Sequence, residues 1–117
     1  MTNTAFLSPH TDMKSLEQLY SFRDKKEVLE FMDENYFLLS TLLEAPTKIR
    51  PYFPDAELCL QVHYDPEIMG EVNLLLWINH NFEANEAIDK LHHLDCNWGL
   101  NIPHEVQDKF CVILGAL

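Results

Sequence analysis

The sequence has few glycines and none of the glycine-rich spacings that cradle phosphates. Only three of its 117 residues are glycine, and no Gly-x-Gly-x-x-Gly or related loop occurs. The Gly-x-Ser-x-Gly elbow and local Cys-His signatures of nucleophilic hydrolases are also missing. These absences favour a protein that is not an enzyme, and an enzyme built from scattered residues stays an alternative.

Cysteine is scarce, and long apolar runs are missing. The three cysteines are an odd number, and none has Cys-x-x-Cys spacing. No stretch reaches the roughly 20 apolar residues that span a bilayer, and residues 1–20 lack the basic start and apolar run of a signal peptide. We therefore expect a cytoplasmic protein with reduced thiols and no membrane contact.

Basic residues are outnumbered, because eight Lys and Arg stand against nineteen Asp and Glu for a formal net charge of −11. Such a surface repels a phosphate backbone, so we expect no nucleic-acid partner. A basic protein partner is compatible with this charge. Ordinary solubility is the simpler explanation, because no acidic run is long enough to form an interaction tail.

What is present predicts an N-terminal arm over residues 1–20 and a single α+β domain over residues 21–117. A long N-terminal helix is expected over residues 24–44, with Asp24 and Glu27 at capping-box spacing. Its apolar residues occupy more than one stripe, which indicates cover on more than one side.

Alternating apolar residues predict strands over residues 58–64 and 72–80, joined by a turn into an antiparallel hairpin. A crossover helix over residues 84–94 then leads to a third strand over residues 109–114. The prediction is a three-stranded, mainly antiparallel sheet in the order 2-1-3, with the first strand central and the third parallel to the second. In that order the central strand would carry the most polar outer row.

The stretch LHHLDCNW, residues 91–98, raises the question of a metal site. His93 points away from the apolar stripe of its helix and His92 lies at the stripe's edge, so the two diverge, and helix-end placement explains both. His63 and His80, on the two strands, are weak candidate metal ligands, completed by residues such as Cys59, Asp95, Cys96 or His104. Zinc sites usually show closer ligand spacing, so we expect no metal and no cofactor.

The second face of the predicted sheet is unusually apolar. Leu75 and Trp77 lie on it, together with either Cys111 and Ile113 or Phe110 and Val112 of the third strand, where a solvent-facing sheet normally carries polar residues. Large exposed apolar patches usually mark association. Either the long helix, which carries Phe37 and Leu38, covers this face, or a second subunit does. The expected interface residues are Leu75, Trp77, Phe37, Leu38 and Ile113.

Three stretches resemble a family of small bacterial α+β proteins to which no activity is assigned. They are LYSFRDKKEVLEFMDENYFLLSTLLEA, KIRPYFPDAELCLQVHYDPE and EAIDKLHHLDCNWGL, with YFPD, DPE and LD followed by an aromatic as the most specific pieces. The resemblance implies a compact α+β domain and no catalytic residue. Its members tend to lack histidine at the positions of His63 and His92.

Together these features predict a small protein-interaction module that is not an enzyme and forms a homodimer. The alternative is a metal-dependent or hydrolytic enzyme that uses His63, His80 and nearby acids. The two hypotheses differ in whether His63 and His80 lie close together in the fold.

Overall fold

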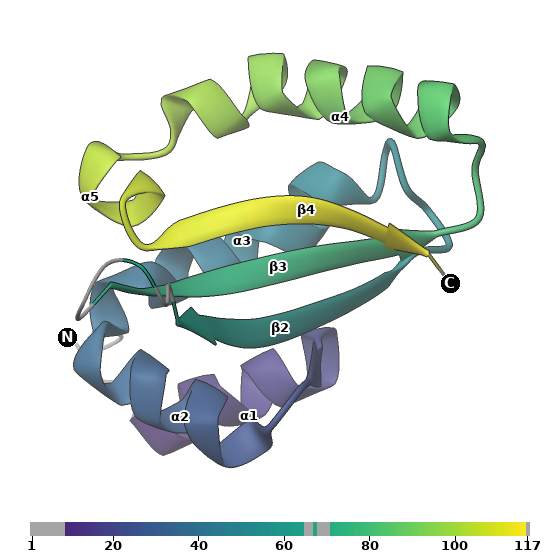
Figure 1. The fold of residues 1–117 in the computed structure, drawn as a ribbon. Helices are drawn as coiled ribbons and strands as arrows, with labels where there is room; N and C mark the ends of the chain where they lie inside the picture. The colour runs from purple at the N-terminus through teal and green to yellow at the C-terminus, as the bar shows by residue number, and fades with distance from the viewer. Residues whose placement is uncertain (1–8, 65–66, 68–70, 117) are drawn as a thin grey trace, which may run out of the picture.

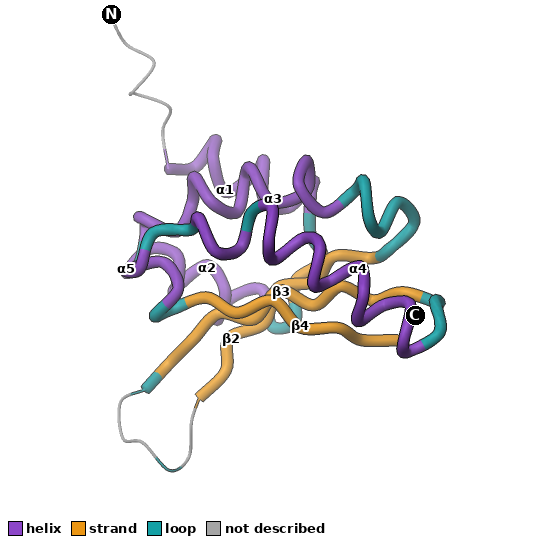
Figure 2. Tube along the Cα trace, turned by 90° about the horizontal axis from the view of Figure 1, so that it is seen from above, coloured by secondary structure: helices purple, strands orange, loops and turns teal. Residues whose placement is uncertain are grey.

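A computed structural model describes residues 9–64, 67 and 71–116 and confirms the α+β class. Within them, a four-stranded mixed sheet carries the helices on one side (Figures 1 and 2). The helices are α1 (Pro9–Leu19), α2 (Lys25–Glu34), η2 (Tyr36–Leu38), α3 (Leu39–Ile49), α4 (Ala84–Asn97), η3 (Gly99–Asn101) and α5 (His104–Gln107). The strands are β1 (Ser21–Phe22), β2 (Glu57–Tyr64), β3 (Val72–His80) and β4 (Phe110–Ala116).

The sheet has the order β1-β2-β3-β4, so the expected three strands and the order 2-1-3 are wrong. The β2–β3 pair is antiparallel, whereas β1–β2 and β3–β4 are parallel, so the sheet is not mainly antiparallel. β4 runs parallel to β3 as expected, but it lies beside β3 because β1 occupies the other edge of β2. Consequently the more polar outer row of β2 lies next to the short strand, and β3 is flanked by two long strands.

Strand register divides the side chains between two faces. One face carries Leu60 opposite Leu76 and Val112, and the other carries Cys59 opposite Trp77 and Ile113. We call the first the covered face and the second the open face. The covered face forms the core, because its central residues are almost completely buried: Leu58, Leu60, Val62, Leu74, Leu76 and Ile78.

The single helix expected over residues 24–44 is wrong, because the chain breaks at Asn35 into α2 and α3. Asp24 caps α2 as expected, its Oδ1 accepting from the Glu27 N–H at 3.2 Å. Asn35 leaves helical geometry at φ −129° and ψ 50°, and its side-chain amide donates to the Phe31 carbonyl at 2.9 Å. Asparagine competes for backbone hydrogen bonds in this way and thereby ends helices. The break lets two apolar stripes reach the core from different directions.

Tyr20, the residue that follows α1, makes a polar contact with α3. Pro46 lies inside α3, and a proline has no N–H for the carbonyl four residues earlier, which belongs to Leu42. The Tyr20 hydroxyl donates to that carbonyl at 2.6 Å and replaces the missing donor. Tyr20 and Leu16 are buried, so residues 14–20 are part of the folded unit.

One side chain shapes the connection from α3 to β2. The Arg50 guanidinium donates to three carbonyls of this connection, at Phe53 (3.2 Å), Pro54 (3.2 Å) and Ala56 (2.7 Å). Phe53, in the middle of this connection, is completely buried. This connection therefore fixes where β2 begins and which of its residues face the helices.

Candidate interaction surface

The open face of the sheet is the surface that the described helices leave uncovered. In the view from above, the helices lie on one side of β2, β3 and β4, and the open face is the other side of these strands (Figure 2). The segment that was expected to form one long helix belongs instead, as α2 and α3, to the covered side. Within the part of the chain that the structure describes, no helix therefore covers the open face, although Cys59 and Asn79 on it are buried by neighbouring side chains.

Trp77 lies at the centre of the open face in a cluster with two polar side chains. Its indole Nε1 donates to Gln61 Oε1 at 2.8 Å. The guanidinium carbon of Arg23 lies 4.9 Å from the centre of the indole ring, and Arg23 Nη1 also reaches Gln61 Oε1 at 3.4 Å. The ring thus has a satisfied donor and a cation over its face, an arrangement that stabilises an exposed tryptophan.

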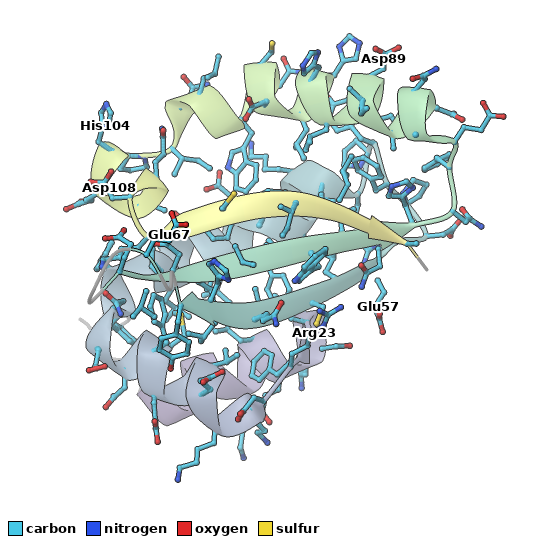
Figure 3. All side chains as sticks on the ribbon, in the orientation of Figure 1. Arg23, Glu57, Glu67, Asp89, His104 and Asp108 are labelled. Carbon is cyan, nitrogen blue, oxygen red and sulfur yellow. The ribbon has the colours of Figure 1, made fainter. Side chains whose placement is uncertain are left out.

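Glycine and asparagine on neighbouring strands determine where the indole can lie. A Cβ on Gly115 would come within 2.9 Å of Trp77 Cε3 and within 2.3 Å of Asn79 Oδ1. Asn79 is buried, and its amide donates to Glu57 Oε1 at 3.3 Å. The absence of a side chain at Gly115 therefore leaves room for both the ring and the amide. Figure 3 shows Arg23 and Glu57 close together beside β2.

The thiol nearest to this cluster is not activated for chemistry. Burial raises the pKa of Cys59, and the neighbouring Arg23 opposes that shift without overcoming it. A thiol with a raised pKa stays protonated near neutral pH and is a poor nucleophile. The open face therefore offers contacts rather than a reactive group at this position.

The structure brings together three of the five expected interface residues. Leu75, Trp77 and Ile113 share the open face, where Trp77 pairs with Ile113 across β3 and β4, and all three are partly exposed. Leu38 is fully buried in the core and cannot contact a partner. Phe37 is 46% exposed but belongs to η2, on the helical side of the molecule. Arg23, Gln61 and Gly115 were not expected at the site.

The two candidate metal ligands on the strands do not converge. His63 pairs with Asn73 on the open face, whereas His80 ends β3 on the covered-face side, about 23 Å along the strand at 3.3 Å per residue. His80 Nδ1 accepts from the Phe82 N–H at 3.0 Å, and its ring lies 5.8 Å from that of Phe53. The described residues contain no group of three or more metal-binding side chains. His63 and His80 therefore lie too far apart in this fold to bind one ion together.

The histidines of α4 also have structural surroundings. His93 stacks on Tyr52, with ring centres 6.5 Å apart and planes 6° from parallel. The Tyr52 hydroxyl in turn accepts from Asn97 Nδ2 at 2.6 Å. Both interactions attach the C-terminal half of α4 to the α3–β2 connection, which agrees with interpreting LHHLDCNW as the end of a helix.

A groove of about 340 Å³ lies between α4 and β4. Its walls are mostly apolar and include Leu91, Trp98, Ile102 and Val112. His92, Asp95 and Cys111 also line it, but no hydrogen bond or ion pair connects these three described residues, and the Cys111 thiol donates to the Val112 carbonyl at 3.8 Å. A nucleophile, base and orienting acid that act together need such links. Among the described residues of the groove, these three side chains are therefore not linked to one another.

Comparison with known proteins gave no match to a family model, to a curated protein or to a solved structure. The chain is thus assigned to no family. Among the described residues, no helix combines the length and the apolar character that crossing a bilayer requires.

Proposed function

We propose that the protein is an interaction module that is not an enzyme and that forms a homodimer whose contact includes Ile113, in the apolar row of its open face. The observation that supports this proposal is the position of Leu75, Trp77 and Ile113 on a sheet face that no described helix covers. Tryptophan and arginine are the residues most enriched at the energetic centres of protein interfaces, and Trp77 carries Arg23 on its ring.

The surface has the composition of an interface rather than of a solvent-facing sheet. Sheets with one wet face normally alternate apolar and polar residues, whereas β3 places Leu75 and Trp77 on its outer side. Polar residues at the margin, such as Glu57 and His63, match the polar rim that surrounds an apolar interface centre. A hydrolytic function has less support, since neither the thiol of Cys59 nor the separated histidines form a reactive set.

The test compares two matched substitutions by sedimentation and light scattering at micromolar concentration. Ile113→Asp places a charge in the apolar row and should convert a dimeric wild type to monomer. Ile88→Asp is the control, because Ile88 is 49% exposed on α4 and lies outside the row; it should leave the mass unchanged. A wild-type protein that is monomeric throughout this range would refute the homodimer.

A further inference from the structure

The outer edge of β4 has no strand partner within the described part of the chain. β4 pairs only with β3 and forms one edge of the sheet (Figure 1). Its seven residues, FCVILGA, include no charge and no proline. The opposite edge is formed by β1, which has two residues. Natural sheets protect edges with short strands, charges or proline, so β1 is protected in this way and β4 is not.

The register shows which backbone groups of β4 face outward. The Leu74 N–H donates to the Lys109 carbonyl at 2.8 Å, so Lys109 directs its carbonyl toward β3. Successive residues of a strand direct their backbone groups to opposite sides. Phe110, Val112, Leu114 and Ala116 therefore present their N–H and C=O groups away from the sheet. An incoming strand would find donors and acceptors on every second residue.

These outward groups match themselves in an antiparallel arrangement. If two copies of β4 meet with Ile113 on a twofold axis, Val112 lies opposite Leu114 of the second copy and Phe110 lies opposite its Ala116. Every one of the four outward-facing residues then belongs to a hydrogen-bonded pair. The two Ile113 residues become a non-hydrogen-bonded pair, whose Cα atoms approach to about 4.5 Å.

Charge also favours a second copy at this edge. Two molecules with a formal net charge of −11 repel one another over most approaches. Residues 110–116 contain no ionisable acid or base apart from the Cys111 thiol, so the pairing of β4 with itself brings no like charges opposite each other within the strand.

The groove beside β4 supplies additional apolar surface. It runs between β4 and the α4–η3 segment, and Leu100 on its wall is 70% exposed. Stable dimers bury roughly 1,600 Å² in total. Pairing of two seven-residue strands alone would bury less than this area. Contact by the helical segments of a second copy would bury the groove and Leu100.

We infer that the homodimer forms by antiparallel pairing of β4 with β4 of a second copy, which joins two sheets into one of eight strands. This inference rests on the proposed homodimer and specifies its geometry: Ile113 is the residue of the apolar row at the contact, whereas Leu75 and Trp77 stay on the outer surface of the joined sheet. Ile113 lies at the centre, and the two open faces become one continuous surface with a Trp77–Arg23 cluster on each half.

Disulfide trapping tests this geometry. In a background with Cys96→Ser and Cys111→Ser, which removes the two exposed thiols, Ile113→Cys should be oxidised by copper phenanthroline to a cross-linked dimer in high yield. A Cα separation of about 4.5 Å is within the range that disulfides require. Leu75→Cys is the matched control on the same face. Its two copies would be at least about 14 Å apart, three strand spacings, and should not cross-link.

The outcomes separate the geometry from the dimer itself. Cross-linking at position 113 and not at 75 supports edge pairing. Cross-linking at 75 and not at 113 means that the open faces meet each other, which overturns edge pairing and keeps the homodimer. Equal yields at both positions, or none in a protein of dimeric mass, also overturn edge pairing. A monomeric mass for the wild type overturns both the inference and the proposed function.

Discussion

The two faces of the sheet have similar residues on β3 and very different surroundings. Leu74, Leu76 and Ile78 are completely buried under the helices, whereas Leu75 and Trp77, which alternate with them, are partly exposed. The apolar character of a strand therefore does not reveal which face the chain covers. On the covered face, leucine is held by packing. On the open face, an indole is held by a hydrogen bond and a cation.

The sharpest test of this difference uses adjacent leucines of one strand. Leu76→Ala should lower the free energy of unfolding by about 2–5 kcal/mol, because it leaves a cavity in a closed core. Leu75→Ala should cost less than about 1 kcal/mol in the monomer, because water already reaches the site. Urea denaturation at equal protein concentration, followed by circular dichroism, measures both. Similar costs at the two positions would mean that both faces are covered.

The polar contact within the helical layer should give the next largest effect. Tyr20→Phe leaves the Leu42 carbonyl without its donor and should cost about 1–3 kcal/mol. In a Pro46→Ala background the residue-46 N–H can bond this carbonyl, so the same substitution should cost about 1 kcal/mol less. Unfolding of all four variants gives the coupling. Strict additivity would show that the hydroxyl does not compensate for the proline.

The same tyrosine should make the covered side sensitive to alkali. Burial raises the pKa of Tyr20 above its ordinary value of 10.0. The folded protein thus keeps this proton while the unfolded chain loses it. The stabilising effect is fully present below about pH 10 and declines above it by up to about 1.4 kcal/mol per pH unit. Urea midpoints between pH 8 and 11 should fall more steeply for wild type than for Tyr20→Phe, and parallel curves would contradict this.

The smallest effect should come from the cation on the open face. Arg23→Ala removes the charge over the Trp77 ring and should cost about 0.5–1 kcal/mol. Lys26→Ala removes a charge of the same sign from an exposed position of α2 and should be nearly neutral. Urea denaturation of the two variants side by side measures the difference. An equal cost would assign the effect to net charge instead of to the ring.

Much of the covered face could be predicted from the sequence, because burial on one side leaves a periodic record. Alternation located β2 and β3 within a residue, and the narrow stripe of α4 located the crossover helix. The helix break at Asn35 left no such record, since apolar residues continue across it. β1 has only two residues, too few to show alternation. Without β1, the sequence pattern leaves the other edge of β2 free, and a right-handed crossover then places β4 there, which is the wrong strand order.

The open face could be predicted only in part. Strand parity placed Leu75 and Trp77 on one side, and Gln61 shares that parity, so its position beside Trp77 follows from the β2–β3 register. Arg23 and Gly115 could not be found in this way. Arg23 comes from the end of an unpredicted strand, and the need for glycine at 115 depends on how the indole lies across β4. Both contacts depend on tertiary placement, which periodicity does not encode.

The two tryptophans give this molecule a separate optical label for each side of the sheet. Trp98 is buried beside the groove, whereas Trp77 lies half-exposed beneath a guanidinium. Collisional quenchers should reach Trp77 and leave the fluorescence of Trp98 unchanged. Replacing either one with phenylalanine would leave a single emitter, whose spectrum reports association or loosening on its own side alone.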